Sequence, residues 1–257
     1  MEALDIVLPV YNEQNAIVRS TRALWSFCAE NLDCRWRIVI VNNASEDGTL
    51  HIARKLARGL PKVSVIHLDQ KGRGRALKKA WSESAADYRC YMDIDLSSEL
   101  SQLPALVQAL RCGYDIAVGS RLCDGANTTR SVFRDVLSRG YNQLLHVVLA
   151  TRFSDAQCGF KAITSRVAAE LLPRVRSQNW FFDTELLVLA AHAGFRILDV
   201  PVTWVEDRDS RVNVGRAIVE DIVGIIGLKY RLSIVKERAG HQADGGGTVQ
   251  AEPERDH

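Results

Sequence analysis

The chain has 257 residues, of which 47% are hydrophobic and 25% charged, close to the averages of soluble globular proteins. This length suits one larger α/β domain. The formal net charge is only +2, so the protein as a whole is not basic enough to attract nucleic acid by its overall charge. Six scattered cysteines without a C-x-x-C pair, no secretory signal and no apolar run of ~20 residues favour a cytoplasmic protein. At a membrane it would lie on the surface or need a partner that crosses it.

Short apolar runs alternate with helical patterns through the first half of the chain. Strands are expected at residues 6–10, 37–41, 63–66 and 88–92, and helices at 15–32, 50–60 and 74–86. This alternation predicts a mainly parallel sheet built from βαβ units and flanked by helices. Ligands bind such sheets at the carboxyl ends of the strands, where polar loops begin at Pro9, Asn42, Asp69 and Asp93.

Two amphipathic helices are expected in the second half. Residues 133–150 and 214–234 each carry an apolar stripe. Basic Arg130, Arg134 and Arg139 accompany the first stripe and favour contact with a membrane surface, whereas core packing is the expected role of the second. We therefore expect a catalytic domain at 1–213, a C-terminal amphipathic helix at 214–238 and a disordered tail at 239–257.

An Asp-x-Asp pair follows the strand expected at 88–92. Asp93 and Asp95 lie two residues apart, so in an extended segment both side chains point to the same side. Their oxygens suit Mg²⁺ or Mn²⁺, which also bind substrate phosphates and help a diphosphate to leave. Alone, such a pair is more often two solvated acids, and its place at a strand end favours the metal site.

Motifs in a fixed order resemble a known family. Val7–Glu13, Asn42–Thr49, Lys71–Ala76 and Asp93–Asp95 resemble family 2 glycosyltransferases of the GT-A fold, which is Rossmann-like with a mixed, mainly parallel sheet. Later segments at 118–121, 155–161, 180–187 and 202–212 resemble polyprenyl-phosphate sugar synthases. Within these, the string Asp-Ala-Gln-Cys-Gly-Phe-Lys at 155–161 resembles dolichyl-phosphate glucosyltransferases more than mannosyltransferases.

The resemblance implies a role for each matching residue. It places the nucleotide-sugar donor, a UDP-sugar by preference, against Pro9, Tyr11, Glu13, Asn43, Arg73, Asp93 and Arg211. Arg73 replaces the usual lysine, and the pair Asn42-Asn43 lacks the usual aspartate. The metal would be held by Asp93 and Asp95, with Ser97 standing where mannosyl relatives have a glutamine. The implied catalytic set is Asp95, Arg121, Arg134, Ser138 and Asp155.

In that set, Arg121, Arg134 and Ser138 would bind the phosphate of a polyprenyl acceptor. Arg134 and Ser138 lie one helical turn apart, and arginine forks match phosphate oxygens. A phosphate monoester has its second pKa near ~6, so it needs no strong base. Asp155 and Glu185 are therefore expected to fix sugar hydroxyls or a loop, and Cys158 is expected to be a packed thiol.

The expected reaction is an inverting transfer of a hexose or N-acetylhexosamine from a nucleotide sugar to a polyprenyl phosphate. One alternative is a transferase that acts on a saccharide hydroxyl and uses Asp155 or Asp183 as a base. Another is a nucleotide-sugar-binding protein without catalysis. A dinucleotide-binding dehydrogenase is excluded, because Lys71–Gly74 lacks the third glycine and does not follow the first strand.

Overall fold

A computed structural model describes residues 1–205 and 214–244, with side chains described in 1–205 and 218–234. The strands are β1 (Ala3–Val10), β2 (Arg35–Asn43), β3 (Val63–Leu68), β4 (Tyr88–Met92), β5 (Ile116–Ser120), β6 (Asn127–Thr129), β7 (Phe160–Thr164), β8 (Ile197–Pro201) and β9 (Thr203–Val205). The helices are α1 (Ile17–Asn31), α2 (Thr49–Gly59), α3 (Arg73–Glu83), η1 (Leu100–Gln102), α4 (Leu103–Arg111), α5 (Val132–Leu149), α6 (Ser165–Leu171), α7 (Phe182–His192) and α8 (Val214–Asp244).

The central sheet has the strand order β3-β2-β1-β4-β7-β5-β8. All neighbouring pairs are parallel except those of β7, which runs antiparallel to β4 and to β5. The carboxyl ends of β1, β2, β4 and β5 therefore meet at one edge of the sheet. The expected mixed, mainly parallel sheet is confirmed, and β6 and β9 form a second, parallel pair.

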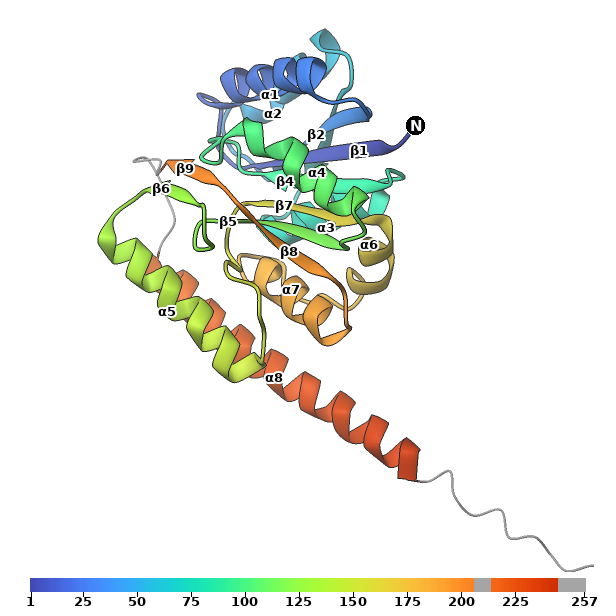
Figure 1. Ribbon diagram of the computed structural model, residues 1–257. Coiled ribbons are helices and arrows are strands. Elements are labelled where there is room, and N and C mark those ends of the chain that lie inside the picture. Colours follow the sequence, from blue (N-terminus) through green and yellow to red (C-terminus); the bar gives the residue numbers. More distant parts are fainter. Residues whose placement is uncertain (206–213, 245–257) are drawn as a thin grey trace, which may run out of the picture.

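Alternating strand residues divide the core into two layers. Ile6 and Ile38 pack with α1, α2 and α4 on one face of the sheet. Val7 and Val39 pack with α3, α6 and α7 on the other face. Successive side chains of a strand point to opposite faces, so continuous apolar strands are what a sheet covered on both sides requires. The helices lie on both sides of the sheet in Figure 1.

Helices α5 and α8 lie beside each other at the outside of the fold (Figure 1). Ile225 and Leu228 of α8 are buried in the core cluster that contains α7. A Cβ at Gly224 would come within 2.5 Å of the Phe181 ring, so glycine lets α8 approach the body of the protein closely. The second amphipathic stripe is thus partly docked, as expected.

The rest of that stripe is not in the core. Ile218, Ile222 and Ile226 are 38%, 47% and 65% exposed, so the expectation of core packing is wrong for these residues. The apolar stripe of α8 is wider than the part of the helix that contacts the rest of the protein, so some of its residues stay exposed. The helix also continues to Asp244 rather than ending at 238, in a segment of mostly good helix formers without proline.

Among the described helices, none has both the length and the apolar character needed to cross a bilayer. The boundary expected at 213, the tail beyond 244 and Arg211 fall in or next to segments outside the described residues.

Candidate active site

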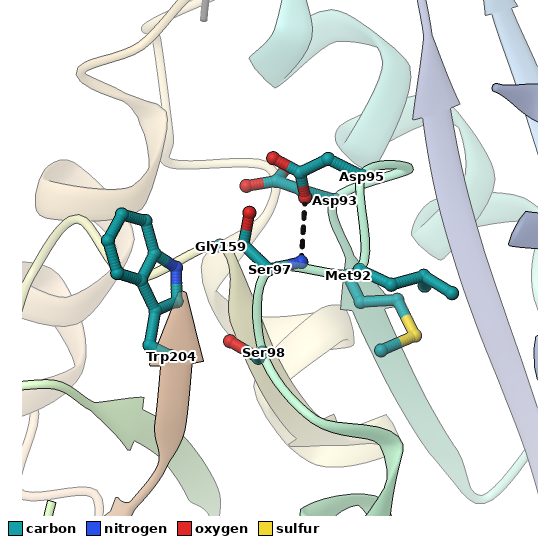
Figure 2. A pocket seen from close by; sticks show the side chains of 8 residues that line it. Met92, Asp93, Asp95, Ser97, Ser98, Gly159 and Trp204 are labelled. Carbon is teal, nitrogen blue, oxygen red and sulfur yellow. Dashed lines mark hydrogen bonds between the residues drawn. The ribbon is translucent and has the colours of Figure 1, made fainter. Parts of the chain in front are cut away.

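Asp93 and Asp95 lie in the loop that follows β4. The Asp93 backbone N–H donates to the Gly159 carbonyl (3.1 Å), and Leu96 adopts a positive φ of 54°, which turns the chain back sharply. The Ser97 N–H then donates to Asp95 Oδ1 at 3.0 Å. As Figure 2 shows, both carboxylates line a small pocket that also contains Ser97, Gly159 and Trp204. The three expected metal-site residues are therefore together.

Gly159 permits this arrangement. A Cβ at residue 159 would overlap the Asp93 carboxylate, so any other amino acid would displace Asp93. Residue 159 precedes β7, the antiparallel strand that pairs with β4. The glycine of the 155–161 string is thus explained by close backbone approach to a carboxylate.

The donor set of this pocket fits a hard divalent cation. Two carboxylates and a hydroxyl supply oxygen ligands, and Asp93 keeps 36% of its side chain exposed. Within the described part of the chain, no cluster of three or more His, Cys, Asp or Glu side chains could hold a metal. Mg²⁺ and Mn²⁺ suit such a sparse oxygen set, because water and substrate phosphates complete their coordination.

The expected donor residues lie at the ends of β1 and β2. The Lys71 Nζ atom stands 3.4 Å from the centre of the Tyr11 ring. The Glu13 N–H donates to Thr49 Oγ1 at 2.8 Å, so the loops after β1 and β2 are held together. Pro9 lies in β1 opposite β2. These residues lie at or near the carboxyl ends of β1 and β2, at the edge of the sheet where the polar loops begin.

Asn43 has a specific partner in this region. Its Oδ1 atom accepts a hydrogen bond of 2.8 Å from the Gly72 N–H, and its side chain is buried. Asn43 therefore holds the loop that leads into α3. Its expected contact with a base or ribose stays a prediction.

Arg73, the first residue of α3, points at the metal-site carboxylates. Its Nη1 atom lies 2.5 Å from Asp93 Oδ1, and its Nε atom 3.8 Å from Asp183 Oδ2. Burial lowers the pKa of Arg73, but the charges of Asp93, Tyr91 and Asp183 outweigh it and hold that pKa well above its usual value. The guanidinium is therefore a fixed positive charge beside the expected diphosphate position.

Arg121 follows the last residue of β5 and is held by Asp155. Its Nε and Nη2 atoms donate to the two carboxylate oxygens at 2.7 and 2.9 Å. The guanidinium also lies 5.4 Å from the Trp204 ring centre. Although burial alone would raise it, the pKa of Asp155 lies below its usual range because of Arg121. Asp155 is thus a fully ionised partner of Arg121.

Trp204 links Arg121 to the Asp-x-Asp loop. The indole lines the pocket of Asp93 and Asp95 (Figure 2), and it also lies against the Arg121 guanidinium. The expected acceptor arginine and the expected metal ligands therefore share one wall. Sequence reasoning did not single out Trp204, because its two partners lie far from it along the chain.

Arg134 and Ser138 both lie in the first two turns of α5, and their expected contact with the acceptor phosphate stays a prediction. Ser138 Oγ accepts a hydrogen bond from Arg130 Nη1 at 3.3 Å, and Arg130 also pairs with Asp135. The Arg130 side chain is only 3% exposed. Ser131 is the N-cap of α5, and its Oγ atom accepts a hydrogen bond from the backbone N–H of Arg134. Arg130 precedes α5, so helical spacing in the sequence does not predict its hydrogen bond to Ser138.

Other acids and thiols have structural partners. Glu185 accepts hydrogen bonds from the N–H groups of Arg176 and Ser177 at 3.1 and 2.7 Å, and it pairs with Arg231 of α8. Glu185 therefore fixes a loop, which is one of the two roles expected for it; the other was to fix sugar hydroxyls. Burial raises the pKa of Cys158 to about 11, which keeps it a packed thiol.

Comparisons with known proteins agree with this geometry. The family model "Glycosyl transferase family 2" matches residues 5–172. Glycosyltransferase AglD of Haloferax volcanii is 35% identical over 86% of this chain, although the match spans only 35% of that protein. Dolichyl-phosphate beta-glucosyltransferases of Saccharomyces cerevisiae and Mus musculus are 28% and 30% identical, over 91% and 81% of this chain and 77% and 69% of theirs.

Solved structures show the same fold. Glucosyl-3-phosphoglycerate synthase of Mycobacterium tuberculosis, crystallised with Mn²⁺, UDP and phosphoglyceric acid, superposes with a TM-score of 0.66 at 17% identity. The superposition covers 89% of this chain and 78% of that one. The family model, the sequence relatives and the fold converge, and the chain belongs to glycosyl transferase family 2, where it is similar to the dolichyl-phosphate glucosyltransferases.

Proposed function

We propose that this glycosyltransferase moves a hexose or N-acetylhexosamine, with glucose favoured, from a UDP-sugar to a polyprenyl phosphate with inversion of configuration. The similarity to dolichyl-phosphate glucosyltransferases supports the acceptor class. The observation that carries the proposal is the position of Arg121. Through Trp204, this arginine, whose fork would match phosphate oxygens, shares a wall with the carboxylates Asp93 and Asp95.

Each part of the site has a role in this reaction. A bound Mg²⁺ or Mn²⁺ would neutralise charge on the departing nucleoside diphosphate. Asp93, Asp95 and Ser97 would hold it, and Arg73 would meet the diphosphate. Arg121 would orient the acceptor phosphate so that its oxygen lies in line with the anomeric carbon and the leaving group, which inverts that carbon.

The carboxylates of the site support a phosphate acceptor over a saccharide hydroxyl. A hydroxyl needs a general base whose pKa lies near neutrality. Asp155 is held by Arg121 with a pKa below its usual range, and Asp183 pairs with Lys161 at 2.9 Å. A phosphate dianion requires no such base.

An apolar face formed by α5 and α8 would place the acceptor site at a membrane. It consists of exposed Val132, Phe133, Val136, Leu144 and Val147 from α5, and of Ile218, Val219, Ile222, Val223, Ile226 and Tyr230 from α8. The exposed apolar residues on these two adjacent helices form a larger group than the scattered single ones that are usual on the surface of a soluble protein. With Arg139, which is 60% exposed, at the border of the α5 stripe, the face suits peripheral binding to the cytoplasmic side of a membrane.

The small sheet connects this face to the active site. Trp204 in β9 is opposite Thr128 in β6, and α5 begins shortly afterwards, after its N-cap Ser131. A lipid whose chain lies along α5 would therefore have its phosphate near Arg121. This continuity supports a lipid-linked acceptor.

The test is transfer of radiolabelled sugar to a short polyprenyl phosphate in detergent. UDP-glucose, UDP-N-acetylglucosamine and GDP-mannose are compared as donors, with Mg²⁺, with Mn²⁺ and with chelator. We expect labelled lipid from a UDP-sugar, loss of the product with chelator, and the β-anomer from an α-linked donor. Absence of transfer from all three donors would refute the proposal, and labelling of a saccharide acceptor alone would favour the hydroxyl alternative.

A further inference from the structure

Arg73 bridges two carboxylates that come from different parts of the chain. Its Nη1 atom contacts Asp93 Oδ1 at 2.5 Å, and its Nε atom faces Asp183 Oδ2 at 3.8 Å. The guanidinium carbon lies 5.2 Å from the Tyr91 ring centre and 4.8 Å from that of Trp180. With 13% of its side chain exposed, Arg73 is confined between these groups.

Asp183 is itself fixed from behind. Lys161 Nζ lies 2.9 Å from Asp183 Oδ1, and the Tyr91 hydroxyl donates to the same oxygen. Lys161 also donates to the Cys158 carbonyl at 2.5 Å and to the Tyr91 hydroxyl at 3.2 Å, and it has no exposed surface. Breaking such a buried pair is costly, so Asp183 stays in place. It therefore anchors one side of the Arg73 guanidinium.

The other side of Arg73 contacts Asp93, one of the two carboxylates that would hold the metal. Asp93 has a single negative charge, and the guanidinium already neutralises it at 2.5 Å. A divalent cation bound to Asp93 would stand within a few ångströms of Arg73, where like charges repel strongly in a partly buried site. A diphosphate removes this conflict, because it can accept hydrogen bonds from Arg73 and oxygen coordination from the metal at once.

We propose that Arg73 is a stand-in cation that holds Asp93 until metal and nucleotide arrive together, and that Asp183 is the positioning residue that keeps Arg73 there. Metal alone then binds weakly, and the nucleotide diphosphate strengthens its binding by drawing Arg73 away from Asp93. The arginine fork matters, because it reaches both carboxylates, whereas a lysine ammonium is a point charge that cannot bridge them. This inference rests on the metal and donor site of the proposed function.

The test measures Mn²⁺ binding by the electron paramagnetic resonance signal of the free ion, with and without saturating UDP. Wild type is compared with Arg73→Lys, and with Arg54→Lys at an exposed position of α2 as the matched control. For Arg73→Lys we expect Mn²⁺ alone to bind about 5–10-fold more tightly, a common size for coupling between sites. With UDP present the variant should fall within about twofold of wild type, and the control should match wild type throughout.

A second variant guards against a folding defect. Arg73→Gln removes the charge but leaves Asp183 paired with Lys161 and Tyr91, and its melting curve is recorded first. It should also bind Mn²⁺ alone more tightly, while metal-free UDP binds more weakly. Unchanged or weaker Mn²⁺ binding without UDP in both variants would overturn the stand-in role.

These outcomes separate this inference from the proposed function. If wild type binds no Mn²⁺ even with UDP, both the metal site and the stand-in role fail. If Mn²⁺ binding follows the expected pattern but no lipid phosphate is glycosylated, only the acceptor assignment fails.

Discussion

Asp155 binds the Arg121 side chain through both carboxylate oxygens, with Nε–Oδ2 and Nη2–Oδ1 distances of 2.7 and 2.9 Å. The Arg121 N–H adds a third hydrogen bond to Asp155 at 3.2 Å. Asp155 has no exposed surface, and it lies 34 positions along the chain from its partner. The pair therefore fixes both the direction of the arginine and the loop that contains Asp155.

Asp155→Asn should impair binding of the acceptor phosphate more than binding of the donor. The amide can replace only part of the fork contact, so Arg121 loses its fixed orientation. We expect the KM for polyprenyl phosphate to rise at least about 10-fold, with little change in the KM for the nucleotide sugar. Breaking this buried pair should also lower the free energy of unfolding by about 3–5 kcal/mol.

Steady-state kinetics with each substrate varied in turn provide the measurement for Asp155→Asn. Asp124→Asn, at an exposed position just after Arg121, serves as the matched control and should resemble wild type. An equal rise in both KM values would contradict a specific acceptor role for the pair.

Gly159→Ala should abolish metal binding. The added methyl group would overlap the Asp93 carboxylate and push it out of the pocket. We expect Mn²⁺ affinity in the presence of UDP to fall by about 100-fold or more, as loss of a ligand position in a sparse site implies. The effect is read by electron paramagnetic resonance and by UDP binding.

Gly59→Ala is the control for this substitution, because nothing lies within 4 Å of a Cβ at that position. It should bind Mn²⁺ normally. Retained Mn²⁺ affinity in Gly159→Ala would show that Asp93 is not a metal ligand.

Acidic substitutions on the apolar face of α5 and α8 should weaken membrane binding without unfolding the protein. Val136 and Val223 are both 64% exposed, so glutamate at either position costs little in the fold. Each change removes one apolar anchor and adds repulsion from anionic lipid. Flotation with vesicles of anionic phospholipid should show about a 10-fold lower bound fraction for each variant.

Ser26→Glu on α1 is the charge-matched control, because residue 26 is exposed and α1 covers the opposite face of the sheet. Its flotation should match wild type. Equal loss in the control, or normal flotation of both Val136→Glu and Val223→Glu, would count against this face as the membrane surface.

The docking of α8 should depend on pH through Asp221. Burial raises the pKa of Asp221 from 3.8 to about 6, despite a hydrogen bond from Gln157 Nε2 to its Oδ2 atom at 2.7 Å. The folded state therefore holds a proton that the unfolded state releases between pH 3.8 and about 6. The contribution of this group is most favourable below that interval and is lost as pH rises through it.

Asp221→Asn should remove this contribution. Above pH 7 the variant should be more stable than wild type by about 1–3 kcal/mol, since one pKa unit corresponds to about 1.4 kcal/mol. The difference between the two should shrink towards pH 4. Thermal melts of both proteins from pH 4 to 8 provide the comparison, and a difference that does not vary with pH would contradict the raised pKa.

The local features of this protein could be predicted from its sequence. Apolar runs predict the strands β1 to β4 to within a few residues, because buried parallel strands need continuous apolar side chains. The same pattern predicts that the Asp-x-Asp pair follows the end of β4. Its pocket with Ser97 followed, because those residues are neighbours in the chain.

Features that depend on distant partners could not be predicted in this way. The apolar run of β7 contains Lys161 and gave no indication that the strand inserts antiparallel between β4 and β5. The hydrogen bond from Arg130 to Ser138 depends on how the chain enters α5, because Arg130 precedes the helix. Likewise, helical spacing shows that α8 is amphipathic but not which of its apolar residues meet the body.

The sequence by itself determined the α/β class, the family and the positions of the carboxylates and arginines that define the chemistry. Only the tertiary structure decided which of these charges face each other. Arg73 pairs with Asp93 and faces Asp183, while Arg121 pairs with Asp155, and these partners are brought together by the strand order and by helix packing. The chemistry of a side chain follows from its residue type, but its distance to a partner far away in the sequence depends on how the elements between them fold and pack.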